Sequence, residues 1–163
     1  MPVLSIPRIN ERNIAGICLL EIVPIDLVID IPPAINGTVT GQVTLQPDAQ
    51  WASFALEDNN GRFSEKWSLQ NGDIATEAAL TGAIPKDRPW VLPILWSLKA
   101  QRFLVAFRSQ NRTRYLMGNQ HSPVMATVTD RIIGEADGSD SARNELRLAF
   151  TLRDRFPVPF HRV

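Results

Sequence analysis

The dipeptide Asn71-Gly72 lies between two runs of alternating apolar residues and constrains the fold more than any other feature. Asn-Gly is the preferred pair for a two-residue type I′ turn, because both central positions need a positive φ. Such a turn pairs Gln70 with Asp73 and puts the alternating side chains on one face. These side chains are Phe63, Trp67 and Leu69 before the turn and Ile74, Thr76, Ala78 and Leu80 after it. We therefore predict a β-hairpin in which Leu69 lies opposite Ile74, Trp67 opposite Thr76 and Phe63 opposite Leu80.

Further β patterns surround this hairpin. Residues 102–109 form a nearly continuous apolar run, which predicts a buried strand that returns through a tight turn to residues 113–117. Residues 145–152 alternate strictly, with Leu146, Leu148, Phe150 and Leu152 facing inward. Residues 25–31 also alternate, which predicts a half-buried strand with Ile25, Leu27, Ile29 and Ile31 on one face. Other strands are predicted at residues 14–23, 38–45, 50–57 and 123–133.

The β pattern is interrupted once, by a proline-containing segment at residues 85–100. Pro93 is natural as the opening residue of a helix, so we predict one short α-helix at about residues 90–101. The chain shows no βαβ alternation and no internal repeat. We predict a mainly β fold, either an antiparallel β-sandwich or a distorted β-barrel, in one domain over residues 1–163. Residues 1–13 are predicted to form an N-terminal arm.

The segment at residues 153–163 is predicted to form an extended C-terminal arm. Pro157 and Pro159 prevent regular strand pairing there, and Phe156 and Phe160 are too apolar for a tail in free solvent. We expect this arm to lie across a neighbouring subunit, where Arg155 supplies a charged hydrogen-bond donor.

Charge and composition exclude several functional classes. The 17 basic and 17 acidic side chains give a formal charge of zero, whereas dedicated nucleic-acid binders carry a basic excess. A net charge near zero also favours association between copies. No apolar stretch approaches the roughly 18 residues that span a bilayer, and the first residues lack a signal-peptide pattern. The single cysteine, Cys18, cannot form an intrachain disulfide. We expect synthesis in the cytoplasm and no membrane partner.

The common catalytic motifs are missing, including the glycine-rich phosphate loops, HExxH, CxxC and GxSxG. His121 lies in a loop without a nearby ligand partner, and the pairs Glu57–Asp58 and Asp137–Asp140 fall in turn-like segments. We therefore predict a non-enzymatic protein with no catalytic residues, no cofactor and no metal. A hydrolase that uses Asp137 and Asp140 is the least favoured alternative.

Two groups of residues are candidate subunit contacts. Arg108, Arg112 and Arg114 cluster on one predicted hairpin, and arginine is enriched at interfaces. Phe156, Phe160 and Arg155 form the second group, in the C-terminal arm. Contact between the arginine hairpin and DNA, without sequence specificity, stays open. The alternative function is a ligand- or carbohydrate-binding β module with stacking surfaces from the four tryptophans, Trp51, Trp67, Trp90 and Trp96.

The second half of the chain carries a series of features in a recognisable order. Residues 84–119 read IPKDRPWVLPILWSLKAQRFLVAFRSQNRTRYLMGN, and after a further strand residues 137–150 read DGSDSARNELRLAF. Over about residues 60–160 the chain resembles small structural proteins encoded in phages and prophages of the Bacteroidetes group. One departure is Arg112, where a glycine would be usual after Asn111. The resemblance implies a tail, neck or tube component of a virion that assembles with itself and with other virion proteins.

Overall fold

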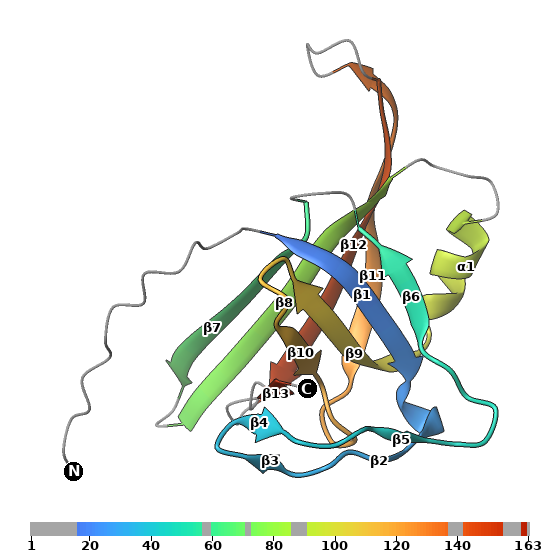
Figure 1. Cartoon of the computed structure of the whole chain (residues 1–163). Coiled ribbons are helices and arrows are strands. Elements are labelled where there is room, and N and C mark those ends of the chain that lie inside the picture. The colour runs from blue at the N-terminus through green and yellow to red at the C-terminus, as the bar shows by residue number, and fades with distance from the viewer. Residues whose placement is uncertain are drawn as a thin grey trace.

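The computed structural model describes residues 16–56, 60–70, 73–85, 91–136, 142–154 and 161–162, and everything structural below refers to these residues. They are mainly β-strands, with one short α-helix (Figure 1). The helices are α1 (Val91–Leu98) and the single-turn 3-10 helix η1 (Ile25–Leu27). The strands are β1 (Ile17–Pro24), β2 (Val28–Asp30), β3 (Ala34–Ile35), β4 (Thr38–Val39), β5 (Thr44–Leu45), β6 (Ala52–Ala55), β7 (Arg62–Gln70), β8 (Asp73–Pro85), β9 (Arg102–Ser109), β10 (Arg114–Met117), β11 (Val124–Ala136), β12 (Ala142–Asp154) and β13 (His161–Arg162).

Strand β9 joins the two layers of the fold. One of its edges pairs with β1, which continues to β6. Its other edge pairs first with β10 and then, at Arg102 and Phe103, with β11. From β11 the sheet continues through β12 and β8 to β7. The layer with β1, β9 and β10 therefore packs against the layer with β11, β12, β8 and β7, as expected for a sandwich.

The sheet stays open at both ends in the described part of the chain. Its strand order begins at β3 and ends at β7, and these two strands do not pair with each other. The fold is therefore an antiparallel β-sandwich, and the distorted barrel that the sequence also allowed is not formed. Among the described strands, the one parallel pair is the short contact between β13 and β4.

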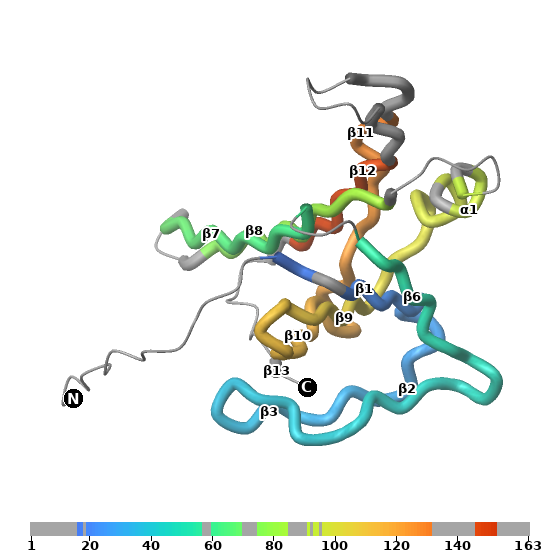
Figure 2. The backbone as a smooth tube through the Cα atoms, turned by 45° about the horizontal axis from the view of Figure 1, so that its top comes forward, coloured from blue at the N-terminus to red at the C-terminus, as the bar shows by residue number. Residues whose placement is uncertain are grey.

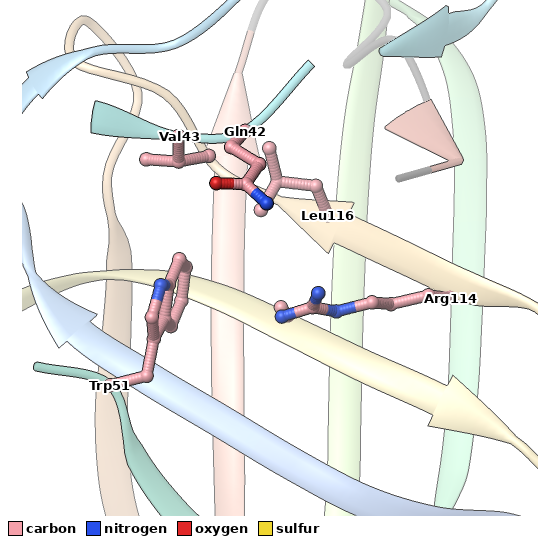
Figure 3. Close-up of a pocket in the computed structure, with 6 residues that line it drawn as sticks. Gln42, Val43, Trp51, Arg114 and Leu116 are labelled. Atoms are coloured by element: carbon pink, nitrogen blue, oxygen red, sulfur yellow. The ribbon is translucent and has the colours of Figure 1, made fainter. Parts of the chain in front are cut away.

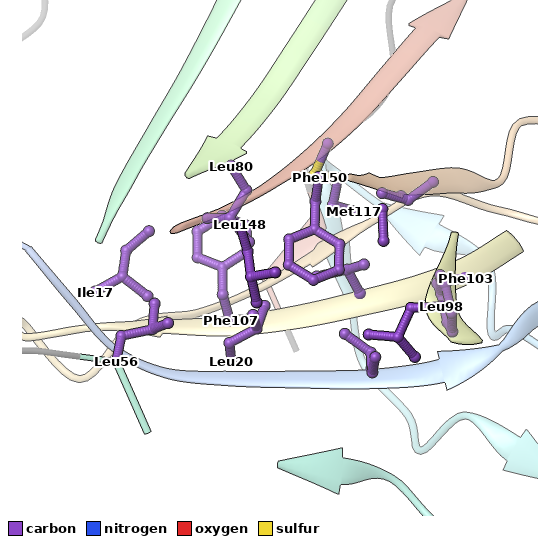
Figure 4. Close-up of a cluster of buried hydrophobic side chains, with 14 of the residues drawn as sticks. Ile17, Leu20, Leu56, Leu80, Leu98, Phe103, Phe107, Met117, Leu148 and Phe150 are labelled. Carbon is purple, nitrogen blue, oxygen red and sulfur yellow. The ribbon is translucent and has the colours of Figure 1, made fainter. Parts of the chain in front are cut away.

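The main core fills the space between the layers (Figure 4). Leu20 of β1 and Phe103, Val105 and Phe107 of β9 face it from one side. Leu80 of β8 and Leu148 and Phe150 of β12 face it from the other. Phe107 of β9 stacks on Phe63 of β7 at 5.1 Å between ring centroids, and on Tyr115 of β10 at 5.2 Å. Aromatic contacts therefore run across both layers.

A second, smaller core lies on the outer face of the β1–β9–β10 layer. Val23, Leu104 and Leu116 face it, and the short sheet of β2 and β5 covers it together with Trp51. Strand β9 is thus buried on both faces from Phe103 to Phe107, which explains why its sequence is a continuous apolar run.

Most predicted strands are confirmed, including the full register of the β7–β8 hairpin and the inward face of β12. The turn residues Asn71 and Gly72 lie outside the described residues. The helix predicted at about 90–101 is confirmed as α1. The single strand predicted at 38–45 is wrong, because β4 (Thr38–Val39) and β5 (Thr44–Leu45) are separate short strands in different sheets. The single strand predicted at 25–31 is wrong, because β1 ends at Pro24 and the chain turns through η1. Val28 is buried and Ile29 exposed in consequence, opposite to the predicted face.

The predicted arms fall mostly outside the described residues. Residues 1–13 and 155–160 are not described, whereas β12 runs to Asp154 and His161–Arg162 form β13. Strand β13 pairs with Tyr115 and Leu116 of β10 in the same chain. The end of the predicted C-terminal arm is therefore held by its own domain. Among the described helices, neither is long and apolar enough to cross a bilayer.

Candidate functional site

The predicted arginine cluster lies on the β9–β10 hairpin, where its three members have different surroundings. Arg108 and Arg114 lie directly opposite each other in the register of the two strands. Arg112 is exposed in the connecting turn, with a positive φ of 63°. Only Arg114 points its charge into the domain, and Arg108 and Arg112 are the exposed members.

Arg114 forms an ion pair with Glu21, although a strand separates them. Its Nη2 atom donates to Oε2 of Glu21 at 2.7 Å, and the two side chains are only 37% and 19% exposed. In the sheet, Glu21 of β1 is aligned with Ala106 of β9. Because Ala106 carries only a methyl group, the Arg114 side chain has room to pass over β9 and reach Glu21.

A pocket of about 250 Å³ opens beside this ion pair. Its lining residues are Gln42, Val43, Trp51, Ala106, Arg114 and Leu116. The indole of Trp51 and the guanidinium of Arg114 face each other across the space, with Gln42 and Val43 along one side (Figure 3). The pocket therefore lies between the outer face of the β9–β10 hairpin and the segment that leads from β4 to β6.

The polar groups of this pocket have few partners within the domain. The Nε atom of Arg114 is buried and has no hydrogen-bond partner among the described residues. A buried donor without a partner costs about 1–3 kcal/mol. Within the described part of the chain, nothing hydrogen-bonds to the indole N–H of Trp51 or to the side-chain amide of Gln42. The pocket thus offers hydrogen-bond donors that the domain itself does not use.

A different surface feature lies on the outermost strand of the second layer. Trp67 and Leu69 of β7 are 70% and 76% exposed. They share a face with Phe63, which packs against the main core near the other end of the same strand. Figure 2 shows the β7–β8 hairpin reaching out past β1 and β10. The hairpin therefore carries its apolar face beyond the layer that covers it at Phe63.

This exposed part of β7 is also the free edge of the sheet. Strand β7 pairs with β8 on one side and with no described strand on the other. The indole N–H of Trp67 donates to Glu65 on the same face at 2.8 Å. Trp67, Leu69 and an unpaired backbone edge together form a surface that we call the β7 edge.

The three described tryptophans do not share a groove. Trp51 lines the pocket, Trp67 lies on the β7 edge and Trp96 is exposed on α1, whereas Trp90 is not described. The three described tryptophans therefore do not form the groove predicted for carbohydrate binding. Of these three, only Trp51 lines the pocket beside Arg114.

Several predicted candidates lie outside the described residues. They are the arm residues Arg155, Phe156 and Phe160 and the acidic pairs Glu57–Asp58 and Asp137–Asp140. His121 is exposed in a loop as predicted, and its backbone N–H donates to Oδ1 of Asn119 at 2.8 Å. Among the described residues, no three or more His, Cys, Asp or Glu side chains gather at a distance that would hold a metal ion.

Sequence reasoning missed Glu21 and Gln42 as members of a site. Glu21 carried a signal, since it is a lone carboxylate inside the apolar run IAGICLLEIV. A charge in a buried strand needs a partner of opposite sign, and Arg114 is 93 residues away in the sequence. Gln42 has no such signal, because it lies in a polar segment between short strands.

Comparison with models of protein families, with curated proteins and with solved structures finds no match to this chain.

Proposed function

We propose that this protein is a non-enzymatic structural subunit that assembles with copies of itself, and that the β7 edge is one of its contacts. The observation that carries the proposal is the exposure of Trp67 and Leu69, at 70% and 76%, on an unpaired edge strand. Single exposed apolar residues are common, but two neighbours on one face of an open edge form a surface for another chain.

The chemistry of the β7 edge favours a protein partner. An open edge strand offers backbone N–H and C=O groups to a further strand, and tryptophan is enriched among the residues that dominate binding energy. Strand β7 contains no proline and no bulge that would protect its open edge, since it pairs with β8 in continuous register. A strand added from a neighbour would cover both the backbone groups and the two apolar side chains.

A second copy of β7 fits this edge in an antiparallel register that places no like charges opposite each other. With the twofold axis at Ser68, Trp67 of each copy lies opposite Leu69 of the other, and Lys66 lies opposite Gln70. Shifting the axis to Lys66 would place two lysines opposite each other, and shifting it to Glu65 would place two glutamates together. Like charges directly opposite destabilise a strand pair, so the register at Ser68 is favoured over these two.

We propose a phage-type virion as the setting of this assembly, with the protein as a tail, tube or neck component made in the host cytoplasm. The resemblance of residues 60–160 supports this setting. Other virion proteins are then further partners, and the exposed side chains of Arg108 and Arg112 are the proposed contacts with them or with DNA. Mass spectrometry of particles purified after induction of the host prophage tests this: absence of the chain from the particles contradicts the setting.

The assembly itself is tested by replacing Trp67 and Leu69 together with threonine, which keeps a good strand former while removing the apolar surface. We expect wild type to form oligomers at micromolar concentration by native mass spectrometry, and the double variant to be monomeric with an unchanged circular dichroism spectrum. A matched control replaces Ile29 and Met125, which are 54% and 49% exposed elsewhere on the domain. Monomeric wild type, or equal loss of oligomers in the control, contradicts the role of the β7 edge.

The ligand-binding alternative is favoured by one observation, the pocket between Trp51 and Arg114. It does not compete with assembly, because the pocket and the β7 edge are built from different strands.

A further inference from the structure

We propose that the pocket between the β9–β10 hairpin and residues 42–51 binds a small carboxylate with a flat, apolar ring. This inference does not depend on assembly, since none of the residues that line the pocket belongs to β7. It rests on three features of the pocket: its donors, its apolar walls and its size.

The donors select the charged end of the ligand. Arg114, whose side chain is 37% exposed, offers N–H groups of its guanidinium, and the indole of Trp51 adds one more N–H. Guanidinium and indole groups donate and cannot accept. An ionised carboxylate accepts and cannot donate, so it matches them, whereas a sugar hydroxyl would also need an acceptor. Gln42 is the only lining side chain that provides one.

Arg114 can bind a ligand carboxylate while it is paired with Glu21. The contact uses one nitrogen, Nη2, rather than the two parallel bonds of a bidentate pair. Glu21 orients the guanidinium from the β1 side, and it is not among the residues that line the pocket. The other N–H groups of the planar guanidinium can therefore donate to a second carboxylate from the pocket side.

The walls select the body of the ligand. Val43, Leu116 and Ala106 are apolar, and the indole of Trp51 faces Arg114 across the space (Figure 3). Aromatic rings pack well against a flat apolar partner. A volume of about 250 Å³ lies below the range for drug-sized ligands, so the space suits a single ring with a short acid group.

Phenylacetate is the test ligand, with two matched controls. Phenylacetamide keeps the ring and loses the charge, and acetate keeps the charge and loses the ring. Binding is followed in ¹H–¹⁵N spectra of the full chain through the indole N–H signals, and the signal of Trp51 is assigned by its loss in Trp51→Leu. We expect phenylacetate to shift this signal with a Kd of about 1 mM or tighter. Each control should bind at least about tenfold more weakly.

Two variants test the residues named. Arg114→Gln removes the guanidinium, and Trp51→Leu removes the indole while keeping an apolar wall. Each variant should weaken phenylacetate binding at least about tenfold. Because Trp51→Leu lacks the indole signal, its binding is followed through the backbone amide signals of β9 and β10. Arg112→Gln, on the same hairpin outside the pocket, should bind as wild type. Because Arg114→Gln also breaks the ion pair with Glu21, its fold is checked by thermal unfolding, and Trp51→Leu decides the question if the first variant unfolds.

The proposal is overturned if phenylacetate shifts no signal near the pocket, if phenylacetamide binds equally well, or if Trp51→Leu binds as wild type. The double variant at Trp67 and Leu69 should bind phenylacetate normally. Failure of assembly and failure of ligand binding are thus distinguished in separate variants.

Discussion

Strands β7 and β9 have similar lengths, 9 and 8 residues, and each forms a hairpin with the strand that follows it. Their surroundings differ sharply. Every residue of β9 from Phe103 to Phe107 is buried, because the strand has a core on each face. Strand β7 is buried on one face near Phe63 and exposed on that same face at Trp67 and Leu69.

The difference shows that pairing and coverage are separate properties of a strand. The alternating pattern of β7 and its expected Asn-Gly turn determine its register with β8, and that register is the one observed. Coverage depends on which element lies across the sheet, which no pattern within β7 specifies. In β9 the pattern does carry this information, because burial on both faces requires a continuous apolar run.

The largest contrast between the two hairpins is expected from deleting one apolar side chain in each. Phe107→Ala should lower the free energy of unfolding by about 3–5 kcal/mol, since the ring is buried and stacks on both Phe63 and Tyr115. Leu69→Ala should change it by less than about 0.5 kcal/mol, because its side chain is 76% exposed. Urea unfolding below the concentration of assembly measures both. Equal losses would show that Trp67 and Leu69 are covered within the monomer.

A smaller effect is expected at the base of the β7–β8 hairpin, where it meets the other layer. A Cβ atom at Gly61 would lie 2.7 Å from Cβ of Ile17 and 2.8 Å from its carbonyl oxygen. Extending the hairpin register by one residue places Gly82 opposite Gly61, and a Cβ there would lie 2.8 Å from Leu56. The missing side chains therefore allow the two layers to approach each other closely.

Gly61→Ala should accordingly destabilise the domain by about 1–3 kcal/mol, because the backbone of Ile17 must move. Ser64→Ala on the same strand is the matched control, and it should cost less than about 0.5 kcal/mol. Thermal unfolding of both variants gives the comparison. A Gly61→Ala variant as stable as wild type would contradict close packing of Gly61 against Ile17.

Much of the fold could be predicted because the patterns there are local. The register of β7 with β8, the inward face of β12 and the position of α1 depend on turn residues and on spacing within one segment. The prediction for residues 25–31 failed because alternation alone does not show that the chain turns. Pro24 ends β1, and the 3-10 turn at residues 25–27 changes which side chains face inward.

Little of the candidate site could be predicted because it is built from distant segments. Arg114 was identified from its place in a cluster of arginines, whereas its partner Glu21 and the indole of Trp51 reach it only through sheet pairing and the second core. The alignment of Glu21 with Ala106 depends on the register between β1 and β9, which no turn connects. The exposure of Trp67 could not be predicted from the sequence either, since Trp67 lies on the same face of β7 that is buried at Phe63.

The smallest predicted effect concerns the turns of the two hairpins. The β7–β8 hairpin already has a glycine in its predicted turn, whereas the β9–β10 turn places Arg112 at a φ of 63°, in the left-handed region. A non-glycine residue there costs about 1–2 kcal/mol, and glycine loses about 0.5–1 kcal/mol more conformational entropy on folding than alanine. The balance favours glycine, so Arg112→Gly should stabilise the domain by about 0.5–1 kcal/mol.

The control for this prediction is Arg112→Ala, which removes the same charge but keeps a Cβ atom in the left-handed conformation. The backbone N–H of Arg112 donates to the carbonyl of Ser109 at 2.9 Å, and both variants retain that bond. If the strain at φ 63° is responsible, only glycine raises the midpoint of urea unfolding. Equal gains in both variants would instead trace the effect to relief of repulsion from Arg108 and Arg114, which lie opposite each other on the two strands that flank the turn. In that case salt should reduce the gain in both variants, because exposed charges are screened, whereas relief of backbone strain is insensitive to ionic strength.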